Sequence, residues 1–287
     1  MRRVGAFVSN VDRGVRARGV ALVGVCNVTP DSFSDGGEFF DPAAAKARID
    51  ALVAEGADIV DVGGESTKPG AKPVSASDQL ERVLPAVRYA ATRALVSIDT
   101  TSPEVADACL EAGAVAINDV SCLRDPALAD VAKRHGAALW IMHSRSTHGA
   151  MIDFSTHPDD AYGDVVDDVA REWEAAAECA LARGVQREAL VFDPGLGFAK
   201  NARHSRELLA RTRGLVARVG VPVMIGASRK SFLRFAAQAS GPTERLGASI
   251  GAAIHAWQSG ARLVRVHDVR ATRQAIDVLR AMEGPHA

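Results

Sequence analysis

The fold of this chain is decided by the stretch Glu55-Gly56-Ala57-Asp58-Ile59-Val60-Asp61-Val62-Gly63-Gly64-Glu65. The glycine at 56 marks the end of a helix, because glycine tolerates the left-handed backbone that commonly closes one. Residues 58–62 are mostly apolar and β-branched, as in a strand that is buried on both faces. A polar, glycine-rich segment follows directly. The stretch therefore predicts a helix, a buried strand and a loop, in that order.

The same unit recurs along the chain. Glycine junctions return at residues 111–114, 135–137 and 259–261, each just before an apolar run. The predicted strands are residues 21–26, 58–62, 95–98, 114–117, 138–142, 189–192, 221–225 and 262–266. Helical spacing of apolar residues occupies 43–55, 103–111, 127–134, 161–182, 248–258 and 271–282. Eight such units predict an α/β fold, a closed (β/α)8 TIM barrel. An open doubly wound sheet is the alternative, but no GxGxxG motif follows the first strand.

Length and composition fit one barrel domain. The chain has 287 residues, of which 47% are hydrophobic and 24% charged, as in an ordinary globular protein. No segment rich in Pro, Gly or Ser divides it. We therefore expect a single domain over residues 1–287, with its core at about 20–282 and an N-terminal extension at 1–19.

Charge and cysteine usage exclude several classes of protein. The net charge of −1 argues against nonspecific binding to nucleic acid, which requires many cations to neutralise phosphates. The four cysteines are scattered without a CxxC pair, which favours reduced thiols over disulfides or a zinc site. No apolar run at the N-terminus is long enough for a signal peptide or a membrane span. The sequence thus predicts a cytoplasmic protein with neither nucleic-acid nor membrane partners.

Polar residues follow nearly every predicted strand. In a barrel these positions meet at one face, where active sites lie. A single Asp or Asn there often caps the next helix, and we interpret Asp119, Thr101 and Asp268 in that way. Convergence of the others in one cavity predicts a binding site, because unpaired polar groups would be costly there. These residues are Asn27, Asp99, Asn118, His143, Asp193, Ser228, Lys230, Arg265 and His267.

The chemistry of this predicted site divides in two. Asp99, Asn118 and Asp193 offer acceptors suited to a flat heterocycle with several N–H donors. A second group, Asn27, Arg265 and His267, offers donors suited to a phosphate or diphosphate. Lys230 fits either half. The combination indicates substitution at a carbon that bears a diphosphate leaving group.

These segments resemble the dihydropteroate synthase family. The matching blocks are residues 27–37, 61–67, 193–198, 228–231 and 265–269, in unbroken order within a resemblance that spans about residues 20–282. Several blocks together are far more specific than one glycine motif. The resemblance implies a transferase of folate biosynthesis, a homodimer that sulfonamides target. It would join 6-hydroxymethyl-7,8-dihydropterin diphosphate to p-aminobenzoate and release diphosphate by an SN1-like displacement.

The resemblance also implies roles for individual residues. Asp99, Lys230, Arg265 and His267 would be catalytic, and Mg²⁺, with Asn27 as its protein ligand, would offset the charge of the leaving diphosphate. The pterin would lie against Asp99, Asn118, Met142, Asp193 and Lys230. The diphosphate would contact Asn27, Thr67, Arg265 and His267. Around p-aminobenzoate the resemblance places Phe33, Thr67, Lys68, Pro69, Phe198 and Ser228.

Three places depart from the family pattern. Lys68 stands where the family has Arg before Pro, which keeps the charge but loses the planar fork. The loop after strand five, residues 142–151, lacks the usual Gly-Thr-Pro arrangement, and we interpret its His143 and His148 as solvated or capping rather than metal-binding. Ser205 replaces a common Asn. Loops tolerate such changes, but two alternatives stay open: a diverged paralogue that binds pterin without coupling, and a pterin-dependent methyltransferase.

Overall fold

Eight parallel strands form the centre of the structure, a computed structural model that describes residues 2–29, 42–65, 74–145, 157–237 and 241–283. They are β1 (Ala21–Asn27), β2 (Ile59–Gly63), β3 (Leu95–Asp99), β4 (Ala116–Asp119), β5 (Ala138–Met142), β6 (Leu190–Asp193), β7 (Met224–Ile225) and β8 (Leu263–Val266). Their hydrogen-bonded order is β6-β5-β4-β3-β2-β1-β8-β7. A parallel bridge between Phe192 and Val223 joins the two ends. The predicted barrel is confirmed.

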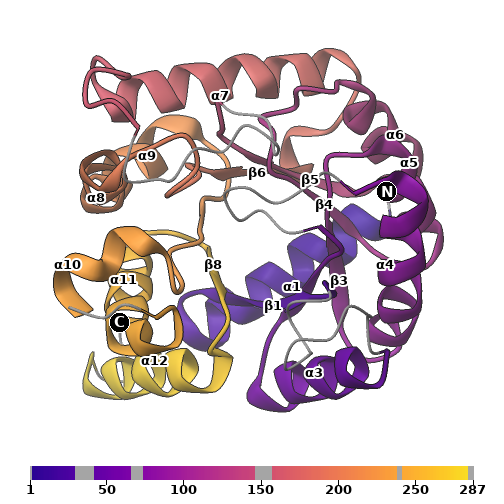
Figure 1. The fold of residues 1–287 in the computed structure, drawn as a ribbon, viewed down its shortest axis with the longest axis horizontal. Coiled ribbons are helices and arrows are strands. Elements are labelled where there is room, and N and C mark those ends of the chain that lie inside the picture. The colour runs from indigo at the N-terminus through magenta and orange to yellow at the C-terminus, as the bar shows by residue number, and fades with distance from the viewer. Residues whose placement is uncertain (1, 30–41, 66–73, 146–156, 238–240, 284–287) are drawn as a thin grey trace.

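Helices surround the strands as a ring (Figure 1). They are α3 (Pro42–Glu55), α4 (Ala76–Ala91), α5 (Pro103–Glu111), α6 (Ala127–His135), α7 (Val165–Ala182), α8 (Ala202–Ala210), α9 (Thr212–Val219), α10 (Arg234–Ala237), α11 (Leu246–Gln258) and α12 (Val269–Glu283). Gly56 and Gly113 have φ values of 95° and 116°, which confirms the left-handed helix ends predicted before strands two and four.

The sequence missed some boundaries for local reasons. Helix α7 starts at Val165 rather than at 161, because Asp164 caps it by accepting hydrogen bonds from the Val166 and Asp167 amides. Strand β7 covers only the end of the predicted 221–225 run. Its first part contains Pro222, which has no N–H to donate to a neighbouring strand. Helix α4, which Ser75 caps, was also not predicted.

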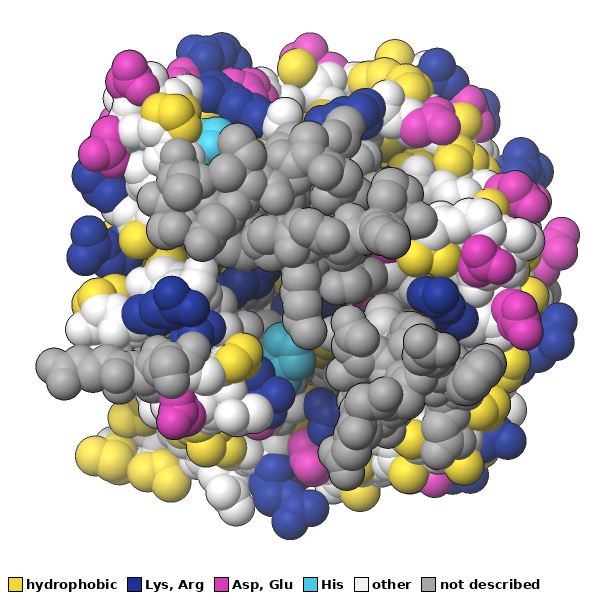
Figure 2. All heavy atoms as spheres, in the orientation of Figure 1, with side chains coloured by type: hydrophobic (Ala, Val, Ile, Leu, Met, Phe, Trp, Pro, Cys, Tyr) yellow, Lys and Arg dark blue, Asp and Glu magenta, His cyan; other side chains and the backbone are white. Residues whose placement is uncertain are grey.

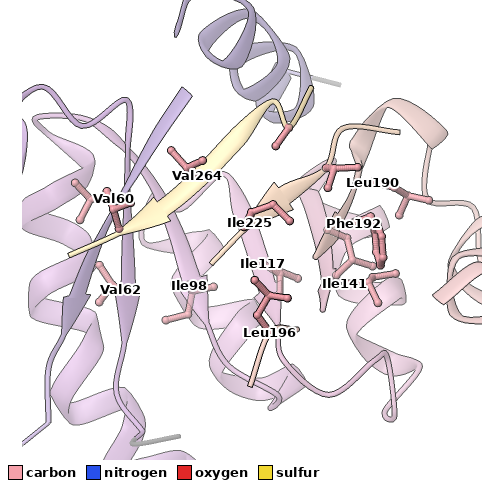
Figure 3. Close-up of a cluster of buried hydrophobic side chains, with 14 of the residues drawn as sticks. Val60, Val62, Ile98, Ile117, Ile141, Leu190, Phe192, Leu196, Ile225 and Val264 are labelled. Atoms are coloured by element: carbon pink, nitrogen blue, oxygen red, sulfur yellow. The ribbon is translucent and has the colours of Figure 1, made fainter. Parts of the chain in front are cut away.

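Side chains alternate between two environments along each strand. One set packs outward against the helices and includes Val60, Ile98, Ile117, Phe192 and Val264 (Figure 3). The other set faces the barrel axis. At its lower end this inward set is apolar and buried, with members Val23, Ile59, Trp140, Val191 and Met224. The core therefore has two parts, one between the strands and the helices and one inside the lower barrel.

Residues 1–19, predicted only as an extension, contain helix α1 (Arg2–Arg18). This helix contacts β1, β4 and β5. Its Phe7 and Val11 are buried in the same cluster as the lower inward residues. The Phe7 and Trp140 rings lie 5.8 Å apart between centroids. Helix α1 therefore covers the N-terminal end of the barrel. No helix in the described part of the chain has the length and apolarity to cross a membrane.

Candidate active site

The upper end of the inward set is polar, in contrast to the lower end. Counting every second residue upward from Val23, Ile59, Leu95 and Leu263 leads to Asn27, Asp61, Asp99 and Arg265. Met142 and Asp193 stand opposite each other in the register of β5 and β6. Strand alternation alone therefore turns the predicted residues toward one mouth. Figure 2 shows Lys, Arg and His side chains on this face, beside segments that are not described.

Asp61 is the centre of the site, and the sequence analysis assigned it no role. Its side chain is fully buried. One carboxylate oxygen accepts from Ser97 Oγ at 2.6 Å. The other accepts from Asn118 Nδ2 at 3.0 Å and from Arg265 Nε at 2.7 Å. A carboxylate in the middle of an otherwise apolar strand was the signal that could have found it, since an unpaired buried charge is too costly to keep.

Arg265 connects this buried centre to the open mouth. Its Nη2 donates to Asp99 Oδ2 at 2.9 Å, while its Nε is held by Asp61. Burial lowers the pKa of the guanidinium, but the carboxylates of Asp61 and Asp99 outweigh it and raise that pKa, so Arg265 stays charged. Burial raises the pKa of the Asp99 carboxyl to about 7, against the opposing effect of Arg265. The charged residue from the predicted diphosphate half thus directly contacts a residue from the heterocycle half.

Asp193 and Lys230 complete the heterocycle half on the opposite strands. Asp193 is buried and accepts a hydrogen bond from the Gly195 amide at 2.7 Å through Oδ1, while its Oδ2 lies near Gly226. Burial raises the pKa of Asp193. The Lys230 ammonium lies 3.9 Å from the centroid of the Phe198 ring. Burial and the neighbouring Arg265 lower the pKa of Lys230 to about 8.

His267 has a defined partner in Ser228. The Ser228 hydroxyl oxygen lies 3.1 Å from the His267 backbone nitrogen, which donates to it, and 3.0 Å from Nδ1. Burial lowers the pKa of His267 to about 3, so the ring is neutral near pH 7. A Ser228 O–H that donates to Nδ1 places the ring proton on Nε2. In either tautomer His267 is a neutral ring here, rather than a second cation.

Asn27, predicted to hold Mg²⁺, ends β1 at the same mouth. A Cβ built on Gly63 would be 3.7 Å from Asn27 Oδ1 and 3.3 Å from the Asp99 Cβ, so these side chains are neighbours. No group of three or more His, Cys, Asp or Glu in the described chain could hold a metal by itself. An amide oxygen suits Mg²⁺, which commonly takes one or two protein ligands and completes its shell with water and substrate phosphates. Asn27 therefore fits a metal that is shared with a diphosphate.

The structure leaves part of the prediction unplaced and corrects another part. Phe33, Thr67, Lys68, Pro69 and also His148 lie outside the described residues. His143 was interpreted as solvated or capping, which is wrong. Its side chain is fully buried, with Nε2 at 2.9 Å from Glu172 Oε2 and Nδ1 at 2.9 Å from Lys200 Nζ.

The three residues interpreted as helix caps differ among themselves. Asp119 accepts hydrogen bonds from the Ser121 and Leu123 amides, so it holds the turn before α6. The cap of α5 is Ser102, next to the predicted Thr101. The side chain of Asp268 pairs with Arg229, at 2.6 Å between Oδ1 and Nη2. This pair orients the segment between β7 and β8 that carries Ser228 and Lys230.

Comparison with known proteins points to one family. The model for "Pterin binding enzyme" matches residues 23–267. The dihydropteroate synthase of Mycobacterium leprae is 45% identical over 91% of this chain and 93% of that protein. A probable bifunctional folylpolyglutamate synthase/dihydropteroate synthase of Haloferax volcanii is 41% identical over 93% of this chain, which spans 31% of that longer protein. The structure of Xanthomonas albilineans dihydropteroate synthase with 4-aminobenzoic acid matches with a TM-score of 0.84 and 38% identity, over 92% of this chain and 93% of that one.

Proposed function

Because the chain belongs to the pterin-binding enzymes and is similar throughout to their dihydropteroate synthases, we propose that it condenses 6-hydroxymethyl-7,8-dihydropterin diphosphate with p-aminobenzoate. The products are 7,8-dihydropteroate and diphosphate, and the role is in folate biosynthesis. The observation that carries this proposal is the Asp61–Arg265–Asp99 chain, with contacts of 2.7 and 2.9 Å. The Arg265 guanidinium there is a donor for the diphosphate, and it also contacts Asp99, an acceptor for the heterocycle.

The pterin half consists of buried acceptors on adjoining strands. Asp99, Asn118 and Asp193 present oxygens to the N–H groups of the pterin edge, and Met142 packs against its ring. The Asn118 Nδ2 group already donates to Asp61, so its free Oδ1 turns toward the ligand as an acceptor. Lys230 donates to a pterin oxygen or nitrogen. An analogue that lacked these N–H groups would leave buried acceptors unpaired, which is the source of specificity.

The diphosphate half consists of fixed donors. His267 donates through Nε2–H, because Ser228 occupies its Nδ1. Arg265 is held by two carboxylates through Nε and Nη2, which leaves Nη1 for a phosphate oxygen. These donors stabilise the anion as the carbon–oxygen bond breaks, and Asp99 stabilises the positive charge that develops on the pterin. Mg²⁺, held by Asn27 and the diphosphate, would supply further neutralisation of the leaving group.

The second substrate is placed beside Phe198. We propose that the arylamine ring packs against Phe198, and that Phe33, Thr67, Lys68 and Pro69 contact it as the family resemblance implies. The support is the contact of the Phe198 ring with the Lys230 ammonium above it, together with 4-aminobenzoic acid in the related Xanthomonas albilineans structure. The amine attacks the exocyclic carbon after diphosphate departs, so no general base is needed before bond cleavage.

A direct assay tests the whole proposal. The protein is incubated with the pterin diphosphate, p-aminobenzoate and MgCl₂, and both diphosphate and dihydropteroate are measured. Omission of p-aminobenzoate should abolish dihydropteroate, and chelation of Mg²⁺ should slow turnover at least tenfold. Absence of product, with pterin binding retained in calorimetry, would identify the chain as a non-catalytic paralogue instead.

We also propose a homodimer that works in the cytoplasm. Helix α12 exposes Val278 and Met282, with 60% and 76% of their surfaces accessible, four residues apart on one face. Neighbouring exposed apolar side chains are surface that a second copy of the chain would cover. Light scattering should give twice the monomer mass of 30.2 kDa. Val278→Glu combined with Met282→Glu should lower that mass to the monomer value, whereas an unchanged mass would place the interface elsewhere.

A further inference from the structure

A buried lysine outside the proposed substrate contacts holds the loop between β6 and α8. Lys200 is fully buried. Its ammonium contacts three backbone carbonyls, those of His143 at 3.3 Å, Gly195 at 3.1 Å and Phe198 at 2.9 Å. It also contacts His143 Nδ1 at 2.9 Å, and within the described residues it forms no ion pair. A desolvated cation without a carboxylate is costly, so a structural filler at this position would be apolar.

Lys200 instead reaches a carboxylate, that of Glu172, indirectly through His143. Glu172 accepts from the Nε2–H of the imidazole at 2.9 Å, and Arg145 also donates to this carboxylate. Because Nε2 then carries the ring proton, Nδ1 is an acceptor and receives an N–H from Lys200. The chain therefore runs from ammonium to imidazole to carboxylate. Burial lowers the pKa of His143 to about 4, which keeps the ring neutral and the direction of these bonds fixed.

The loop that Lys200 holds has an unusual backbone. Gly195 and Ala199 have positive φ values of 66° and 48°. A Cβ on Gly195 would lie 2.0 Å from the His143 carbonyl oxygen, so the loop is pressed against the end of β5. These turns point carbonyls inward. Lys200 binds two of them, and the Tyr162 hydroxyl donates to the carbonyl of Ala199 at 2.9 Å. Without such donors the loop would leave buried carbonyls unpaired.

The same loop presents two residues of the proposed active site, Asp193 on the pterin side and Phe198 on the p-aminobenzoate side. It begins at Asp193, whose carboxylate is fixed by the Gly195 amide, and it carries Phe198, whose ring lies under the Lys230 ammonium. We propose that Lys200 is a positioning residue for the pterin subsite, which acts by holding this loop through its carbonyls and through the His143–Glu172 pair. The inference rests on the proposed function, since it assigns pterin to Asp193 and Lys230.

The electrostatics agree with this role. Burial lowers the pKa of Lys200 to about 7, while the nearby Asp193 carboxylate raises it. The positive charge of Lys200 in turn helps Asp193 to stay ionised in a buried environment that raises its own pKa. Loss of the ammonium would thus change the loop and weaken an acceptor for the pterin at the same time.

The experiment uses Lys200→Met, which removes the charge but keeps a long unbranched side chain. Lys133→Met, the same change at an exposed position in the last turn of α6, is the matched control. Calorimetry measures the Kd of 6-hydroxymethyl-7,8-dihydropterin diphosphate, and hydrogen–deuterium exchange follows the peptide over residues 194–199. We expect Lys200→Met to raise the Kd at least tenfold and to increase exchange in that peptide. The control should match the wild type in both.

A second variant covers the case in which Lys200→Met does not fold. Tyr162→Phe removes one hydroxyl that donates to the same loop and keeps the ring against Arg145. It should raise the Kd roughly three- to tenfold, the effect of one lost hydrogen bond. A lower melting temperature with unchanged Kd and unchanged exchange at 194–199, in whichever variants fold, would overturn the proposal. If the wild type itself binds no pterin, the proposed function fails, and the exchange measurement alone decides whether Lys200 holds the loop.

Discussion

The two ends of the barrel interior have the same backbone and opposite chemistry. At the lower end the inward residues are apolar and helix α1 covers them, with Phe7 against Trp140. At the upper end several inward residues are charged, and Arg265 pairs with both Asp61 and Asp99. Apolar burial stabilises the folded chain. Buried charge pairs do so weakly at best, because desolvation offsets their attraction. The lower end therefore accounts for stability and the upper end for function.

The largest effect should come from Asp99→Asn at the upper end. The amide keeps the size of the carboxylate but cannot stabilise the cationic pterin. We expect kcat/KM for the pterin diphosphate to fall about 1000-fold, or about 4 kcal/mol. The melting temperature should change little, since Arg265 retains Asp61 as a partner. Full activity in this variant would remove Asp99 from the mechanism.

The next largest effect should come from Phe7→Ala at the lower end, which should lower stability and leave activity unchanged. This substitution empties a fully buried ring site against Trp140 and should lower the free energy of unfolding by about 3 kcal/mol. Urea unfolding measures that change. The kcat of the folded variant should remain within twofold of wild type. A large fall in kcat at full folding would show that the two ends are coupled.

At the upper, charged end, kcat/KM should depend on pH through Lys230. Burial lowers the pKa of Lys230 to about 8, so the ammonium form is lost as pH rises through that value. We expect kcat/KM to fall about tenfold per pH unit above it, as for any group that is needed in its protonated form. Lys230→Arg keeps its charge at those pH values, so the alkaline fall should disappear in that variant. The same fall in both proteins would assign it to another group.

The smallest effect is expected from Ser228→Ala. This change removes the hydroxyl that contacts the Nδ1 atom of His267 and accepts from the His267 backbone N–H. Loss of one positioning hydrogen bond corresponds to about 1 kcal/mol, or a roughly fivefold reduction in kcat/KM. Steady-state kinetics in both substrates would locate the change. A rise confined to the KM of p-aminobenzoate would instead support a direct contact between Ser228 and that substrate, as the family resemblance implies.

The sequence pointed to one kind of residue in the mouth and missed another. The inward residues at strand ends were predictable, because a polar residue that directly follows an apolar run stands out at any barrel mouth. Asp61 and Lys200 were not assigned roles. Asp61 was treated as part of a motif, and its pairing with β3, β4 and β8 depends on strands that are distant in sequence.

The sequence predicted the barrel and its polar mouth, because helix spacing, glycine helix ends and buried strands are local signals. Which charges meet depends on how distant segments pack. The tertiary structure placed Arg265 between two carboxylates, made His267 a neutral ring, and buried His143 between Glu172 and Lys200. Those outcomes depend on desolvation and on contacts between distant segments, which no local pattern encodes. Arg265, which the sequence placed in the diphosphate half of the mouth, directly contacts Asp99 of the heterocycle half.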